Sequence, residues 1–167
     1  LTETPDAYAA LWRFLLELDL VAEVSAHELS VEEPLWWMIA DQRAATITVR
    51  DHQYVRILDL VAALETRRYG AAGRLLLDVT DPLGFAGGAF VLEVDADGVG
   101  RVTPVDRDAA PDAALAVRLG ITELSAVYLG GVSLATLHRA GRVITDDPVA
   151  AARVFSWHTP PRLSIWY

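Results

Sequence analysis

The stretch that most constrains the fold is residues 89–105, which read AFVLEVDADGVGRVTPV. β-Branched and aromatic side chains, which favour strands, stand on both sides of Asp97–Gly98. A two-residue Asp-Gly turn between such runs is the strongest short-range sign of a β-hairpin. The stretch therefore predicts an antiparallel pair of strands, against which the rest of the domain has to pack.

The surrounding sequence predicts a sheet with helices. Residues 73–81 and 114–120 read as further strands, so the sheet runs from about 74 to 118. Asp59 caps a predicted helix that Gly70 ends, and N-cap and proline signals begin two later ones at Ser133 and at Asp146 or Asp147. Residues 121–131 are also predicted to be helical. We expect an α+β fold, mainly an antiparallel sheet covered by helices on one face.

The first fifty residues carry a different pattern. A helix is predicted over 4–20, with Thr4 as N-cap, and a short helix over 32–41. Residues 21–24 alternate and are predicted to form a strand. Residues 46–60 alternate on both sides of Asp51–His52, which predicts two strands or one bent strand.

Composition sets the class of protein. Hydrophobic residues make up 53% and charged residues 22%, enough for a packed core. No apolar run approaches the ~18 residues needed to span a bilayer, and no secretory signal is visible. The sequence has no cysteine, which excludes disulfides and thiolate metal sites. We expect a soluble cytoplasmic protein and, since the chain starts at Leu1 without a methionine, a piece of a longer one.

The net charge of −9 bears on possible partners. An acidic surface disfavours nucleic acid, whose phosphates need basic side chains. It suits a cationic substrate, because a negative field concentrates cations near the protein. Plain solubility is the simpler explanation of the same charge.

Several motifs resemble functional sites but are better explained by structure. RRYGAA, residues 67–72, resembles a pyrophosphate loop, yet a predicted helix ends there, and a helix C-terminus repels phosphate. DADGVG, from Asp95, resembles a calcium loop but lacks its ligands at later positions. Ser133 is better explained as a helix cap than as a nucleophile. The isolated histidines predict no metal site: His27, His52, His138 and His158.

Two aromatic features remain. Trp36–Trp37 fits either a core position or the wall of a pocket. The tail WHTPPRLSIWY, residues 157–167, should run extended across Pro160–Pro161. Burying its side chains is worth about 1.5–3 kcal/mol each, while fixing its backbone costs about 1–2 kcal/mol per residue. The tail should therefore order only where a shaped groove receives it, unless it is a terminal strand on the sheet.

Three segments resemble one family. Residues 55–81 and 124–143, the second containing YLGG, resemble two segments of a sterol-carrier-protein-like domain. Residues 18–45 resemble the end of a GNAT-like domain. In this order they resemble the enhanced intracellular survival family of GNAT N-acetyltransferases, of which this chain matches the C-terminal portion. The implied domains are 1–51, part of a second GNAT-like domain, and 52–167, the sterol-carrier-like domain.

The resemblance implies an acetyl-CoA-dependent enzyme that acetylates amines, aminoglycosides among them, and assembles as a homo-oligomer, a hexamer. It places the acetyl-CoA site in a missing N-terminal GNAT domain, so the fragment alone should be inactive. It also implies that the C-terminal carboxylate of Tyr167 enters the substrate cavity as general base, with Trp166 and Ile165 as substrate-binding neighbours. Alternatives are a lipid-binding module, which a continuous apolar cavity over ~300 Å³ would favour, and a purely structural oligomerisation domain.

Overall fold

The computed structural model describes residues 4–51, 53–107, 114–163 and 165. Two compact units are found: residues up to 53 with Arg162, Leu163 and Ile165 form the first, and residues 54–161 form the second.

The first unit is small and weakly packed. It contains helix α1 (Pro5–Leu16), a short helix α2 (Leu35–Met38) and a 3₁₀ turn over Gln42–Ala44. The predicted cap is confirmed, since the Thr4 hydroxyl accepts from the amide of Ala7 at 3.2 Å. Among the described residues of this unit, Trp12 is the one buried hydrophobic side chain.

The strands predicted for this region do not form. Residues 21–24, and the described residues of 46–58, belong to neither strands nor helices. Ile47 and Val49 are 63% and 72% exposed, so their alternation has no core beneath it. A strand needs a neighbouring backbone for its hydrogen bonds, and no described residue pairs with these stretches. His52, the predicted bend, lies outside the described residues.

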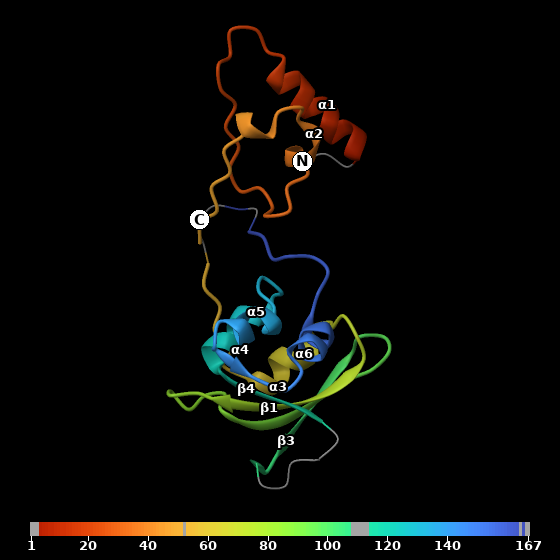
Figure 1. Ribbon diagram of the computed structural model, residues 1–167, viewed down its shortest axis with the longest axis vertical. Helices are drawn as coiled ribbons and strands as arrows, with labels where there is room; N and C mark the ends of the chain where they lie inside the picture. Colours follow the sequence, from red (N-terminus) through yellow and green to blue (C-terminus); the bar gives the residue numbers. More distant parts are fainter. Residues whose placement is uncertain (1–3, 52, 108–113, 164, 166–167) are drawn as a thin grey trace. The chain divides into compact units, whose positions relative to one another are not determined.

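The second unit holds a five-stranded sheet with its helices on one face (Figure 1). The strands are β1 (Gly73–Thr80), β2 (Gly88–Val94), β3 (Gly100–Val105), β4 (Leu115–Gly120) and β5 (Val143–Ile144). They lie in the order β3-β2-β1-β4-β5. The helices are α3 (Leu60–Thr66), α4 (Ile121–Tyr128), α5 (Leu134–Arg139) and α6 (Pro148–Phe155).

The sheet confirms the predicted class and adds two features. The β2–β3 hairpin forms with its turn at Asp97–Gly98, where Gly98 takes a φ of +72° that favours glycine. β4 instead pairs parallel with β1, placing Val117 beside Leu77. The two-residue β5 was not predicted, because so short a strand carries no periodic signal.

Local capping signals place the helices of this unit. The predicted caps are confirmed for three of them, and of the two candidate caps for α6 the structure uses Asp147, whose carboxylate accepts from Ala150 at 2.9 Å. The predicted end of α3 is wrong. The helix stops at Thr66, and Arg68 already forms an antiparallel bridge with Val99, which draws the chain into the sheet before Gly70.

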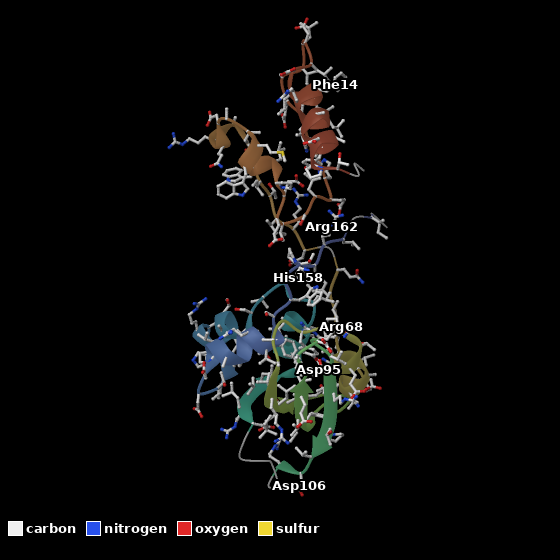
Figure 2. All side chains as sticks on the ribbon, turned by 90° about the vertical axis from the view of Figure 1, so that its right-hand side faces the viewer. Phe14, Arg68, Asp95, Asp106, His158 and Arg162 are labelled. Carbon is white, nitrogen blue, oxygen red and sulfur yellow. The ribbon has the colours of Figure 1, made fainter. Side chains whose placement is uncertain are left out.

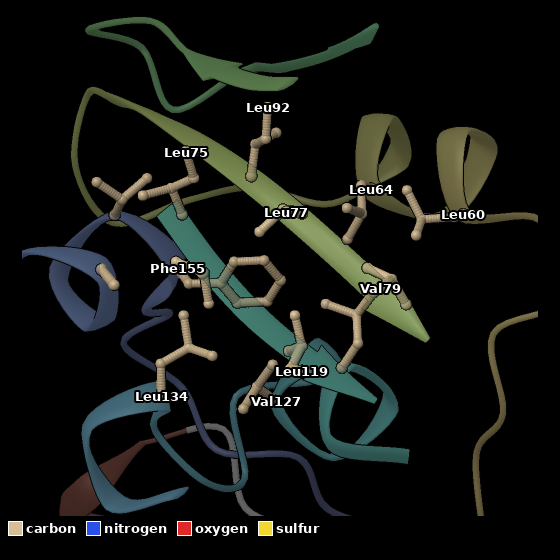
Figure 3. Close-up of a cluster of buried hydrophobic side chains, with 14 of the residues drawn as sticks. Leu60, Leu64, Leu75, Leu77, Val79, Leu92, Leu119, Val127, Leu134 and Phe155 are labelled. Atoms are coloured by element: carbon tan, nitrogen blue, oxygen red, sulfur yellow. The ribbon is translucent and has the colours of Figure 1, made fainter. Parts of the chain in front are cut away.

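The core lies between the sheet and the helices (Figure 3). Inward-facing side chains of β1 and β4 meet Val127, Leu134 and Phe155 from the helices. Leu77, Val117 and Leu124 have no exposed surface at all. This packing holds the C-terminal end of α6 firmly against the sheet.

Candidate functional site at the root of the C-terminal tail

The candidate site lies where α6 ends and the C-terminal tail begins. We call residues 156–161 the tail root; they belong to the second unit and form no helix or strand. Phe155, the last helical residue, is 3% exposed, whereas Ser156 beside it is exposed. The tail therefore starts from a rigid point in the core.

Arg67 joins three elements at this point. Its Nη2 atom donates to the Phe155 carbonyl at 2.8 Å, its Nη1 atom to the Val127 carbonyl at 3.4 Å and its Nε atom to the Arg68 carbonyl at 3.1 Å. Val127 lies in the last turn of α4, and Phe155 ends α6. The guanidinium thus bonds carbonyls at the C-terminal ends of two helices, where a cation is favoured.

Aromatic rings surround the same guanidinium. Its central carbon lies 4.4 Å from the ring centroid of Phe155, 4.7 Å from that of Tyr69 and 6.0 Å from that of Tyr128. Cations over aromatic faces within about 6 Å are attracted by the ring quadrupole. Burial lowers the pKa of Arg67, while Tyr69 and Tyr128 oppose the shift. An arginine stays protonated across physiological pH in any case.

Tyr69, one of the rings beside the Arg67 guanidinium, is itself held in place by two contacts. Its hydroxyl donates to the Leu64 carbonyl at 2.7 Å, and its ring meets Phe155 edge to face at a centroid distance of 5.6 Å. Burial raises the pKa of Tyr69, with Arg67 opposing the shift. The tyrosine therefore remains a neutral hydrogen-bond donor.

Glycines let the tail root lie close to the backbone. A β-carbon on Gly70 would lie 3.1 Å from the Ser156 carbonyl oxygen, and one on Gly131 would lie 3.2 Å from the Pro161 side chain. Gly130 has a φ of +84°, and a β-carbon on it would lie 3.5 Å from the Trp157 side chain. The RRY and YLGG segments, 60 residues apart at Arg67 and Val127, thus meet around the tail root.

Two hollows mark the second unit. The smaller, of about 150 Å³, lies between the α4–α5 turn, α6 and Trp157. The larger, of about 320 Å³, lies at the surface between residues 58–61 and 85–90. Leu58 and Phe85, which line it, are 60% and 64% exposed, so this hollow is open to solvent. Neither has the form of the enclosed tunnel that would favour a lipid-binding module.

The predicted site residues fall mostly beyond this region. Ile165 is 61% exposed and belongs to the first unit. Trp166 and Tyr167 lie outside the described residues. Trp37 is 81% exposed, which matches neither a core position nor an enclosed pocket.

Three motifs that resemble functional sites have structural roles in the second unit. The RRYGAA stretch offers no cradle for pyrophosphate, since Arg67 is bound to carbonyls and the Gly70 amide donates to Val154 at 3.3 Å. Residues 67–72 therefore do not fit the pyrophosphate of acetyl-CoA. Asp95 accepts from the amides of Asp97 and Val99, both at 2.9 Å, which confirms the hairpin turn in place of a calcium loop. Ser133 is confirmed as a cap, its hydroxyl accepting from Thr136 at 3.0 Å.

The second unit has distinct ends (Figure 2). His158 lies at one end of it and Asp106 lies at the other. No group of three acidic or histidine side chains in the described part of the chain could hold a metal ion. None of the helices within that part is long and apolar enough to cross a membrane.

Sequence reasoning missed Arg67 as a site residue. A search for catalytic patterns singles out carboxylates, histidines and nucleophiles, whereas Arg67 acts on backbone carbonyls from two distant helices. The available signal was an arginine followed closely by an aromatic, Arg67 and Tyr69, at a helix end.

This fold and site define a sterol-carrier-type domain whose C-terminal tail is held at its root. The family model for the sterol carrier protein domain matches residues 60–164, and that for an acetyltransferase (GNAT) domain matches residues 1–57. The chain belongs to the enhanced intracellular survival (Eis) family of GNAT N-acetyltransferases and corresponds to the sterol-carrier-like part with the end of the preceding GNAT-like domain.

Comparisons with individual proteins support the same family. The chain is 39% identical over 150 residues to an uncharacterized N-acetyltransferase of Streptomyces avermitilis, covering 89% of this chain and 34% of that protein. It is 36% identical over 150 residues to N-acetyltransferase Eis of Mycobacterium tuberculosis, covering 86% and 34%. The crystal structure of Eis1 from Mycobacterium abscessus superposes with a TM-score of 0.79 at 29% identity, over all of this chain and 42% of that one. The chain thus spans about a third of the length of these curated relatives.

Proposed function

We propose that this chain is the C-terminal portion of an acetyl-CoA-dependent N-acetyltransferase that acts on cationic amines, and that it delivers a general base. The base is the terminal carboxylate of Tyr167, with Trp166 and Ile165 beside the substrate. The observation that carries the proposal is the tail root. Arg67, the glycines and Phe155 fix the start of a tail whose proline pair limits its conformations.

The proposed reaction requires this chain to place one carboxylate beside the substrate amine. A protonated amine has to lose a proton before its nitrogen can attack an acyl group. A terminal carboxyl has an ordinary pKa near ~3.5, and desolvation in a cavity raises the pKa. The carboxylate then accepts that proton directly or through one water.

Acetyl-CoA would supply the activated acetyl group when bound to the GNAT domain outside this chain. The missing N-terminal domain is therefore the first partner that the proposal requires. The net charge of −9 supports a polycationic acceptor, an aminoglycoside or a similar amine, because the field of the protein concentrates cations.

The test moves the carboxylate without changing the tail's side chains. In the full-length protein, one glycine appended after Tyr167 shifts the carboxylate by about 3.5 Å. We expect kcat for kanamycin acetylation to fall about a hundredfold, since misplacement of a reacting group is that costly. Tyr167→Phe is the matched control, because it keeps the carboxylate in place, and its kcat should stay near that of the parent.

Deletion of Trp166–Tyr167 should also lower kcat strongly and leave the circular dichroism spectrum unchanged. Full activity in the appended and the deleted variants would refute the general-base role. Loss of activity in Tyr167→Phe alone would assign the role to the phenol in place of the carboxylate.

The resemblance also implies assembly, and we propose that the full-length protein is a homo-oligomer, a hexamer. Light scattering coupled to size-exclusion chromatography tests this independently of activity. A mass equal to one chain at micromolar concentration would refute it.

A further inference from the structure

The hydrogen bonds of Arg67 connect the start of the C-terminal tail to the turn against which the tail root lies. Its three hydrogen bonds to described residues go to backbone carbonyls, two of them at the C-terminal ends of α4 and α6. One side chain thus holds the end of α6, from which the tail begins, and the end of α4, which is followed by the turn at Gly130–Gly131.

The point of attachment matters because the tail is long. Phe155 is the last residue of α6, and the residues after it, 156–167, reach about 40 Å when extended. A rotation at the end of α6 therefore changes the direction in which these residues leave the domain. Holding the Phe155 carbonyl and ring at once leaves this residue little freedom to rotate.

The second attachment holds the surface on which the tail root lies. Arg67 binds the Val127 carbonyl, and the Gly130 amide donates to that same oxygen at 3.0 Å. Gly130 and Gly131 then lie next to Trp157 and Pro161. A displacement of Arg67 would loosen the tail's starting point and its supporting turn together.

We propose that Arg67 is a positioning residue. By joining the ends of α4 and α6, it sets the direction in which the C-terminal tail leaves the domain. It acts through Phe155 and the glycine turn and touches no substrate. Its effect on turnover rests on the proposed function above, whereas its effect on the tail root does not.

The test uses the full-length protein and two readouts. A spin label on Thr159→Cys, an exposed position of the tail root in a sequence without cysteine, reports the motion of the tail. Any cysteines outside this chain are first replaced. Arg67→Met keeps the length and apolar contacts of the side chain but removes the donors, and Arg68→Met is the matched control, since Arg68 is exposed.

We expect the label in Arg67→Met to tumble faster than in the parent, because the tail root has lost its anchor at the Phe155 carbonyl. The kcat for kanamycin should fall about tenfold or more with KM little changed, because the reacting group is misplaced while substrate binding remains. Arg68→Met should match the parent in both. Should Arg67→Met fold poorly, Arg67→Gln, which keeps a donor for Phe155, should give a smaller change in the same direction.

The outcomes separate the two proposals. An unchanged label spectrum in Arg67→Met and Arg67→Gln would overturn the positioning role, whatever happens to turnover. A faster label with unchanged kcat would support the positioning role and refute the need for a placed tail in catalysis. Equal effects in Arg68→Met would reduce the role to general positive charge and so overturn the proposal.

Discussion

Arg67 and Phe155 contact each other twice, through a 2.8 Å hydrogen bond to the carbonyl and through a ring centroid 4.4 Å from the guanidinium. The hydrogen bond fixes the backbone of Phe155, and the ring contact fixes its side chain. Phe155 is also part of the main hydrophobic core. The direction in which the tail leaves the domain is therefore coupled to core packing, and variants near this pair should reveal that coupling.

Gly70 should not tolerate a side chain. A β-carbon there would clash with the Ser156 hydroxyl and would lie 3.1 Å from its carbonyl oxygen. We expect Gly70→Ala to lower the free energy of unfolding by about 1–3 kcal/mol, measured by urea denaturation of the 167-residue chain. Ala72→Ser, at an exposed neighbour, is the control.

Ser156→Ala should relieve part of this cost in the double variant, since it removes the nearest clashing atom. Strict additivity of the two substitutions would show that Ser156 is not what Gly70 accommodates.

Removal of the Tyr69 hydroxyl should isolate one buried hydrogen bond. Tyr69→Phe leaves the Leu64 carbonyl without its 2.7 Å donor but keeps the ring against Phe155. The expected loss in unfolding free energy is about 1–3 kcal/mol. Tyr128→Phe alters the other, half-buried tyrosine beside Arg67 and should cost less. Equal costs would contradict a specific role for the Tyr69 hydroxyl.

The cap of α6 should be specific to one of two adjacent acids. Asp147 accepts from the Ala150 amide at 2.9 Å, whereas Asp146 precedes the cap. Asp147→Ala should destabilise the chain by about 0.5–2 kcal/mol, seen as a lower midpoint in thermal unfolding. Asp146→Ala should leave that midpoint nearly unchanged, and the reverse order would mean that the cap is misassigned.

Asp81 should make stability depend on pH in the acid range. Desolvation raises the pKa of this carboxyl, but hydrogen bonds from the Leu83 and Ala86 amides and from Arg56 outweigh it, so the pKa is lowered below its usual value near 3.8. A carboxyl with a lower pKa in the folded state stabilises the fold above its unfolded pKa. That contribution is lost as the pH falls through the folded value.

The check is the thermal midpoint between pH 5 and pH 2, where Asp81→Asn should flatten part of the acid decline. Asp97→Asn, at an exposed acid in the hairpin turn, is the control. An identical acid decline in the parent and in Asp81→Asn would contradict the prediction.

Sequence patterns succeeded where the causes are local. Thr4, Asp59 and Ser133 were predicted as caps because a cap binds an amide only three residues away. The Asp97–Gly98 turn is local in the same sense. Patterns failed over residues 46–58, where alternation predicts a strand but no described residue supplies a partner backbone.

What the sequence determined by itself is thus most of the helices and the four longer strands of the second unit, the caps, the hairpin and the family that its motifs resemble. Only the tertiary structure decided that β4 lies parallel to β1 and that Arg67 meets Phe155, 88 residues away. The physical reason is range. Propensities and caps act over a few residues of backbone, whereas the pairing of distant segments depends on how the whole core closes around Leu77 and its neighbours.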